Sequence, residues 1–253
     1  MGERSACQKA VLIYLVLSGL VALAYFFADR QLAAELRPHL SGVEFFPWLT
    51  HIVDPLGPLA SIGLAVLAAR ALARGFLTPL ESSLIRLSCA ILIAWAFKEE
   101  LKWAFGRTWP ETWIKASPNP SYFGNGTYGF FPFHGGQGYA SFPSGHTTAI
   151  TAFAGAVWVL WPKLRWLAVA LALAVAIGLL GADYHWLSDI IAGGILGGTA
   201  GMAAARIGRH NAGASSNFPA NAGGPLGFPS REPPSGSSVT ASKTFPSGSP
   251  PVR

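Results

Sequence analysis

Ser144, Gly145 and His146 follow a proline and open an apolar run that is typical of a helix. Ser144 stands where an N-cap residue is expected, so its hydroxyl and the free N–H groups of the first helical turn point at one spot. The positive end of the helix dipole favours an anion there. His146 adds an imidazole that can move a proton at neutral pH. Taken alone, the segment is equally compatible with an ordinary capped helix that carries a surface histidine.

A second histidine, His185, also lies at the mouth of an apolar helix, and Asp189 follows it by four residues. Residues at this spacing share a helical face. The carboxylate can therefore hold the imidazole in one tautomer and stabilise its cation. The other ring nitrogen is then prepared to attack an electrophile. The pair predicts a nucleophile and the residue that orients it.

Two lysines, Lys98 and Lys102, share a face in a third segment that also holds Glu99 and Glu100. Like charges one helical turn apart repel each other unless an anion, or the neighbouring glutamates, lies between them. For Lys98 we favour the interpretation that it belongs to a charge cluster at the edge of the membrane.

The elements that must position these residues are membrane helices. The chain has 253 residues, of which 51% are hydrophobic and 12% charged, whereas soluble domains have roughly 25% charged residues. A helix needs about 20 apolar residues to span a bilayer. Runs that approach this length lie at 11–28, 56–73, 84–105, 147–161, 166–182 and 186–205, of which 147–161 is short. The sequence thus predicts an all-α, polytopic membrane helical bundle with about six transmembrane helices.

These runs divide the chain into a short cytoplasmic N-terminus at 1–10, a six-span domain at 11–206 and a C-terminal tail at 207–253. The tail is rich in Gly, Pro and Ser, cannot bury a core and is predicted to be disordered. The segment 43–53 contains a glutamate, a proline and a histidine and is predicted to be interfacial or re-entrant. The first run lacks a small-residue cleavage site and is interpreted as a retained anchor.

Lysine and arginine predict the orientation, because they collect in cytoplasmic loops. The basic residues on one side of the predicted bundle are Arg4, Lys9, Arg70, Arg74, Arg86, Lys163, Arg165, Arg206 and Arg209. Both termini are therefore predicted to be cytoplasmic and the motif-bearing helix ends exterior, although Arg30 and Arg37 also fall on the exterior side. We expect a multi-pass protein of a bacterial inner (plasma) membrane with a periplasmic site.

The net charge of +6 does not indicate nucleic-acid binding. The basic residues are scattered at helix ends without a stripe or a recognition motif, and they suit a leaflet of anionic lipid. Cys7 and Cys89 fall in the N-terminal tail and in a span, where no disulfide is expected. The sequence contains no Cys/His pattern of a metal site.

The loop 108–142 is long for a membrane bundle and is dense in aromatic residues and glycines. Loops of this length are often functional, but Trp and Tyr also favour the membrane interface. The loop is therefore compatible with a roof over a pocket and with a layer on the membrane surface. His134 is interpreted as part of the loop structure.

Taken in this order, the segments 102–110, 143–146 and 185–189 resemble the three motifs of the phosphatidic acid phosphatase type 2 superfamily, which also includes the vanadium haloperoxidases. The resemblance covers roughly residues 80–206. It implies a helical bundle with six spans that hydrolyses a lipid phosphate or diphosphate. The implied partners are the bilayer and its lipid substrate, and no cofactor or metal is implied.

The resemblance also implies roles for the matching residues. His185 attacks phosphorus and forms a phosphohistidine, Asp189 orients His185, and His146 protonates the leaving oxygen. The groups that hold the phosphoryl oxygens are Lys102, the Ser144 hydroxyl and the Gly145 N–H. Phosphoryl transfer needs such positive and N–H groups on the equatorial oxygens.

Two positions depart from the family pattern, which has arginines where this chain has Trp109 and Leu179. Arg107 is predicted to fold over the phosphate and to compensate for both, and Lys115 is a more remote candidate. Because these two arginines are replaced, a non-catalytic lipid-binding or scaffolding relative is an alternative. Another is metal-dependent catalysis, because two histidines and a carboxylate can form a facial metal site; its candidate residues are His134, His146, His185 and Asp189.

Overall fold

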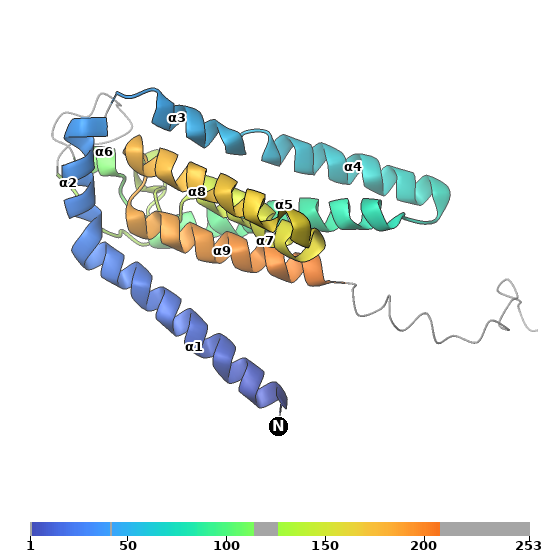
Figure 1. Ribbon diagram of the computed structural model, residues 1–253. Coiled ribbons are helices and arrows are strands. Elements are labelled where there is room, and N and C mark those ends of the chain that lie inside the picture. Colours follow the sequence, from blue (N-terminus) through green and yellow to red (C-terminus); the bar gives the residue numbers. More distant parts are fainter. Residues whose placement is uncertain (1, 41, 114–125, 208–253) are drawn as a thin grey trace, which may run out of the picture. The chain divides into compact units, whose positions relative to one another are not determined.

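The computed structural model describes residues 2–40, 42–113 and 126–207. The described chain is a bundle of helices without named strands (Figure 1), which confirms the predicted all-α class. The predicted tail after Ile207 and the candidate Lys115 lie outside the described residues.

The elements follow one another along the chain with short connections, apart from the long loop between α6 and α7. They are α1 (Gly2–Leu23), the π-helical turn η1 (Ala24–Ala28), α2 (Asp29–Leu40), α3 (Phe45–Thr50), η2 (His51–Val53), α4 (Leu56–Arg74), α5 (Pro79–Phe105), α6 (Pro110–Trp113), η3 (Gln137–Tyr139), α7 (Gly145–Leu160), η4 (Pro162–Leu164), α8 (Arg165–Gly181) and α9 (Leu187–Arg206).

Five helical stretches of the described chain are long and apolar enough to cross a membrane. They are Cys7–Leu40, Phe45–Arg74, Pro79–Phe105, Pro162–Gly181 and Leu187–Arg206. α7 is apolar but has only 16 residues. Together these six helices make an integral membrane protein with about the predicted number of spans, and the short one is where the sequence predicts it.

Two boundaries differ from the predicted ones. The first helical stretch is longer than 11–28, because helix begins at Gly2 and continues through η1 and α2 to Leu40. The segment 43–53 is not a separate piece: α3 and η2 lead into α4 within one apolar stretch, and α3 packs against α8. The contacts with α8 give this segment a partner that its own sequence does not reveal.

α7 is the central helix and packs most extensively against α9. The two backbones approach closely because α9 carries glycines at the crossing. A Cβ atom at Gly197 would collide with the carbonyl oxygen of Thr148, and one at Gly201 would collide with that of Ala152. Small residues allow such close packing of membrane helices. This contact fixes the start of α7 against the start of α9, where the candidate catalytic residues lie.

Local signals set both ends of α5. Thr78 and Glu81 form a capping box at its start, and Glu81 also accepts a hydrogen bond from Arg70 at 3.0 Å, which ties α4 to α5. At the other end Gly106 adopts a left-handed conformation with φ of 56°. A Cβ atom there would collide with the carbonyl oxygen of Phe131. The glycine therefore lets the chain leave α5 directly beneath the long loop.

The helix ends that carry the three motifs lie together (Figure 1). α5 and α8 end there, and α7 and α9 begin there. The start of α1 and the end of α9 lie at the opposite end of the bundle. The structure thus places the motifs at one end, as the sequence predicts. Which side of the membrane this end faces stays a prediction.

Candidate active site

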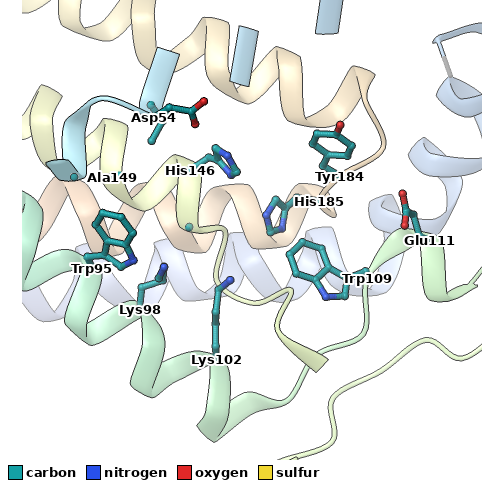
Figure 2. Close-up of a pocket in the computed structure, with 13 residues that line it drawn as sticks. Asp54, Trp95, Lys98, Lys102, Trp109, Glu111, His146, Ala149, Tyr184 and His185 are labelled. Atoms are coloured by element: carbon teal, nitrogen blue, oxygen red, sulfur yellow. The ribbon is translucent and has the colours of Figure 1, made fainter. Parts of the chain in front are cut away.

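A cavity of about 630 Å³ lies among these helix ends (Figure 2). It brings together residues from η2, α4, α5, α6, α7 and the turn before α9. They are Val53, Asp54, Gly57, Trp95, Lys98, Lys102, Trp109, Glu111, Gly145, His146, Ala149, Tyr184 and His185. Both predicted histidines and Lys102 therefore face one cavity, although 83 residues separate Lys102 from His185 in the chain.

His146 enters the cavity from the first turn of α7. Ser144 is the N-cap: its side chain accepts a hydrogen bond from the Thr147 N–H at 3.4 Å, and its own N–H donates to the Asp189 carbonyl oxygen at 3.1 Å. Ser144 is fully buried and does not line the cavity, whereas Gly145 and His146 do. The capping contact uses the Ser144 hydroxyl as an acceptor, and the contact of this hydroxyl with phosphate stays a prediction.

His185 and Asp189 meet as their spacing predicts. Nδ1 of His185 lies 3.4 Å from Oδ2 of Asp189, and both side chains are buried. The same carboxylate oxygen accepts hydrogen bonds from the Ser141 hydroxyl and, at 3.2 Å, from the Trp186 N–H. These bonds fix the carboxylate, which leaves Nε2 of the imidazole for the cavity. Burial lowers the pKa of His185, although Asp189 opposes the shift, so the imidazole is neutral at pH 7.

Trp109 and Lys102 lie beside His185 on the cavity wall. The Trp109 ring centroid is 4.7 Å from that of His185, and the Lys102 ammonium is 5.4 Å from the Trp109 ring. The Trp109 indole N–H donates to the Gln137 carbonyl oxygen at 2.6 Å, which fixes the ring. An aromatic face therefore stands where the family pattern has an arginine, and it orients the nearby ammonium by a cation–π contact.

The second replaced position, Leu179, has a different environment. Leu179 is fully buried in an apolar cluster with Ile150, Val175 and Ile190, and it does not line the cavity. An arginine at this place would bury a charge among apolar side chains. Of the two departures from the family pattern, only Trp109 therefore changes the chemistry of the cavity.

The sequence predicts that Arg107 folds over the phosphate, and the structure places Arg107 elsewhere. Its side chain is fully buried and does not line the cavity. Nη2 donates to Oδ2 of Asp29 at 2.6 Å, and Nη1 donates to Oδ1 of Asp189 and to the Ser188 hydroxyl. Burial alone lowers the pKa of Arg107, but the carboxylates of Asp189 and Asp29 raise it above its ordinary value. Two buried carboxylates need a cation, and Arg107 supplies it.

The described part of the long loop, 126–142, packs over Arg107. The Thr108 N–H donates to the Gly129 carbonyl oxygen at 3.2 Å, and the Phe131 N–H donates to that of Gly106 at 2.9 Å. The rings that lie within 4.9 to 5.6 Å of the guanidinium carbon are those of Tyr25, Tyr128, Phe130 and Trp186. The aromatic residues of this loop thus enclose an ion-pair network. The sequence predicts either a roof over a pocket or a layer on the membrane surface, and neither prediction describes this enclosure.

Asp29 belongs to the same buried ion-pair network as Arg107. Nothing near Asp29 in the sequence links it to the three motifs. It begins α2, directly after the π-helical turn, and is fully buried. Oδ1 accepts a hydrogen bond from the Ser188 N–H at 2.9 Å, and Oδ2 binds Arg107. The available signal was that an ionisable residue inside an apolar span is usually functional.

Lys98 also lines the cavity, which the predicted charge cluster does not indicate. Its side chain is 9% exposed and pairs with Glu99 at 2.5 Å. Lys98 and Lys102 extend from α5 toward the cavity side by side (Figure 2). Their spacing of four residues was the signal, but it does not tell which way the shared face points.

Two carboxylates, Asp54 and Glu111, line other parts of the cavity. Asp54 pairs with Nδ1 of His51 at 2.7 Å, and both side chains are exposed. Burial raises the pKa of Glu111, and the nearby Asp183 raises it further, although Arg37 lowers it. These groups place two carboxyl side chains on the cavity wall.

His134 does not line the cavity. Its ring packs 5.0 Å from Tyr139 and 6.0 Å from Phe131, within the loop. In the described parts of the chain, no group of three His, Cys, Asp or Glu side chains is placed to hold a metal ion. The arrangement thus separates His134 from the two cavity histidines that the metal alternative would combine with it.

Comparison with known proteins agrees with the motifs. A family model described as the PAP2 superfamily matches residues 83–212. A lipid A 1-phosphatase of Rhizobium etli is 35% identical over 98 residues, which are 39% of this chain and 38% of the relative. One of Rhizobium johnstonii is 34% identical over 93 residues, or 37% of this chain and 34% of the relative. The matched part thus spans little more than a third of each relative, and no solved structure matches significantly.

Proposed function

This chain belongs to the PAP2 superfamily, and we propose that it hydrolyses a lipid phosphate or diphosphate at the cavity through a phosphohistidine on His185, on the exterior face of the membrane. The observation that carries the proposal is the meeting of His185, His146 and Lys102 on one cavity, with a fixed carboxylate behind His185. A nucleophile, a proton donor and a cation are the groups that phosphoryl transfer needs.

In the proposed reaction, Nε2 of neutral His185 attacks phosphorus and the bond from phosphorus to the lipid oxygen breaks. Protonated His146 gives its proton to that oxygen, so the lipid alcohol, or a lipid phosphate, leaves. Asp189 stabilises the imidazolium through Nδ1. Water then attacks the phosphohistidine and gives a proton to His146, the bond between phosphorus and Nε2 of His185 breaks, and inorganic phosphate leaves. Lys102 and the Gly145 N–H hold the phosphoryl oxygens, while Ser144 and Arg107 position Gly145 and Asp189.

Release of inorganic phosphate from a panel of lipids tests this proposal. We expect the purified full chain in detergent to release phosphate from at least one lipid phosphate or diphosphate in the presence of a chelator. Because the two relatives are lipid A 1-phosphatases, the panel includes a lipid A phosphate beside phosphatidate, phosphatidylglycerol phosphate and an isoprenyl diphosphate. Release that stops with chelator and returns with a divalent metal would instead support the metal-dependent alternative.

Because Trp109 replaces an arginine of the family pattern, a second candidate function is the binding of lipid without turnover. The packing of the Trp109 ring on His185 at 4.7 Å is the observation in its favour, because an aromatic wall binds lipid without binding phosphate. Binding of the same lipids with no phosphate release from any of them would identify this second function.

The pH dependence of the reaction follows from the burial of His185. Only the neutral imidazole attacks, and burial lowers the pKa of His185 from its ordinary value of 6.5. The neutral form therefore persists as the pH falls below 6.5, and the acid limb of the kcat/KM profile is expected below that value. Because Asp189 raises the pKa, the limb should move to still lower pH in Asp189→Asn. An acid limb above pH 6.5, or an acid limb that does not shift in Asp189→Asn, would show that another group titrates.

A further inference from the structure

Lys98 lines the cavity but has no role in the proposed mechanism. Its side chain lies against the first residue of α7: a Cβ atom on Gly145 would be 3.1 Å from Cδ of Lys98 and 3.4 Å from Nζ. The ammonium therefore stands at the N-terminal end of α7, beside the backbone N–H that the mechanism assigns to phosphate. It also lies 5.0 Å from the Trp95 ring, which fixes it on the cavity side.

This environment is electrostatically unfavourable for a cation. The N-terminus of a helix carries the positive end of its dipole, and the Lys102 ammonium projects from the same face of α5 one turn away. The partner of Lys98 is Glu99 at 2.5 Å, whose side chain is 59% exposed. A carboxylate facing solvent screens a buried ammonium only partly. An anion between the two lysines and the start of α7 would remove the repulsion.

The two lysines and the two histidines line the same cavity. Lys98 lies beside Trp95, and Lys102 lies between Lys98 and Trp109 (Figure 2). Lys102 contacts the Trp109 ring that packs on His185. A phosphoryl group that meets Lys102 in the cavity is thus one helical turn of α5 away from the Lys98 ammonium.

We propose that Lys98 is a phosphate-binding residue whose ammonium contacts a phosphoryl oxygen of the substrate, as the second cation of the site. This inference rests on the proposed function. Lys98 then supplies, from one turn before Lys102, the charge that is lost where Trp109 replaces an arginine. Glu99 competes with the phosphoryl group for the same ammonium.

Binding of inorganic phosphate and pyrophosphate to the full chain in detergent tests the inference without requiring turnover. Lys98→Met removes the charge but keeps the length of the side chain. A charge-assisted hydrogen bond corresponds to a loss of affinity on the order of 10- to 100-fold. Lys98→Arg should retain most of the affinity. The matched control is Lys163→Met, because Lys163 is an exposed lysine in η4, outside the cavity, and should bind like the wild type.

Glu99→Gln gives an opposite and independent test that leaves Lys98 in place. Without the competing carboxylate, phosphate should bind several-fold more tightly. The same substitution in the Lys98→Met background should change nothing. An equal gain in both backgrounds would mean that Glu99 acts on phosphate without Lys98, which overturns the inference. If Lys98→Met fails to fold, the wild-type background still tests the inference, because an unchanged phosphate affinity in Glu99→Gln would overturn it.

Substrate kinetics identify which phosphoryl group Lys98 contacts. A rise in KM for both a lipid monophosphate and a lipid diphosphate places Lys98 on the transferred group, and a rise for the diphosphate alone places it on the group that leaves. Unchanged KM values and unchanged anion affinities in Lys98→Met overturn the inference and leave the proposed function intact. A wild-type protein that releases no phosphate and binds neither anion would instead overturn the proposed function.

Discussion

Replacing His185 by Ala is expected to abolish phosphate release and to remove any acid-labile phosphoenzyme. The substitution removes the only nucleophile of the proposed mechanism, so turnover should fall by at least about 10⁴-fold. The measurement is phosphate release together with trapping of labelled protein from a substrate that carries labelled phosphate. Asp189 lies 3.4 Å from Nδ1 of His185, which is why His185 and not His146 is assigned as the nucleophile.

Two other histidines serve as controls for this experiment. His146→Ala should slow departure of the lipid oxygen but keep labelling by a substrate with a good leaving group, because such a group needs no proton. His134→Ala should retain turnover, because its ring packs within the loop and not on the cavity. If His185→Ala still forms the phosphoenzyme, the nucleophile has been assigned to the wrong residue.

Arg107→Ala is expected to destabilise the protein strongly as well as to reduce its activity. The substitution leaves Asp29 and Asp189 buried without their shared cation. Removal of one partner from a buried ion pair costs about 3–5 kcal/mol in the free energy of unfolding. Because the Asp189 carboxylate also loses its anchor, kcat should fall by on the order of 100-fold. Thermal unfolding in detergent and steady-state kinetics measure the two effects.

A contact with phosphate, as the sequence predicts for Arg107, would give a different pattern. KM would rise while the unfolding temperature stayed at the wild-type value. The double variant Asp29→Asn/Arg107→Gln separates the cases further, because it removes one charge of each sign. In the buried network it should recover part of the stability lost in Arg107→Ala. Arg107→Lys should recover little, since one ammonium cannot bridge two carboxylates as the guanidinium fork does.

The fold could be predicted because its signals are local. Each apolar run is long enough to mark a helix, and the caps at Thr78 and Ser144 mark where two of them begin. The meeting of His185 with Asp189 follows from their closeness in the chain, because His185 lies in the turn before α9 and Asp189 in the first turn of that helix. The meeting of His146, His185 and Lys102 follows from the order of the spans. Consecutive spans run in opposite directions, so the end of α5 lies on the same side of the bundle as the starts of α7 and α9.

The destination of Arg107 could not be predicted from its neighbours. Its partner Asp29 is 78 residues away in another span, and no local pattern links the two. The direction of Lys98 is a similar case, because spacing defines a face of α5 but not the helix which that face meets. The contact between Lys98 and Gly145 depends on how α5 packs against α7, which is set by side chains along both helices.

The buried carboxylate of Asp29 has a consequence for biogenesis. The span Cys7–Leu40 is mostly exposed, so few apolar contacts hold it to the bundle. Its buried polar partners, Arg107 and Ser188, are synthesised 78 and 159 residues after it. We therefore expect this helix to enter the membrane first and to dock last, after the ribosome has completed α9. In a nascent chain that is stopped before α9, the first helix should stay undocked and accessible to quality-control proteases. Docking of this helix would then report that the ribosome has translated past His185.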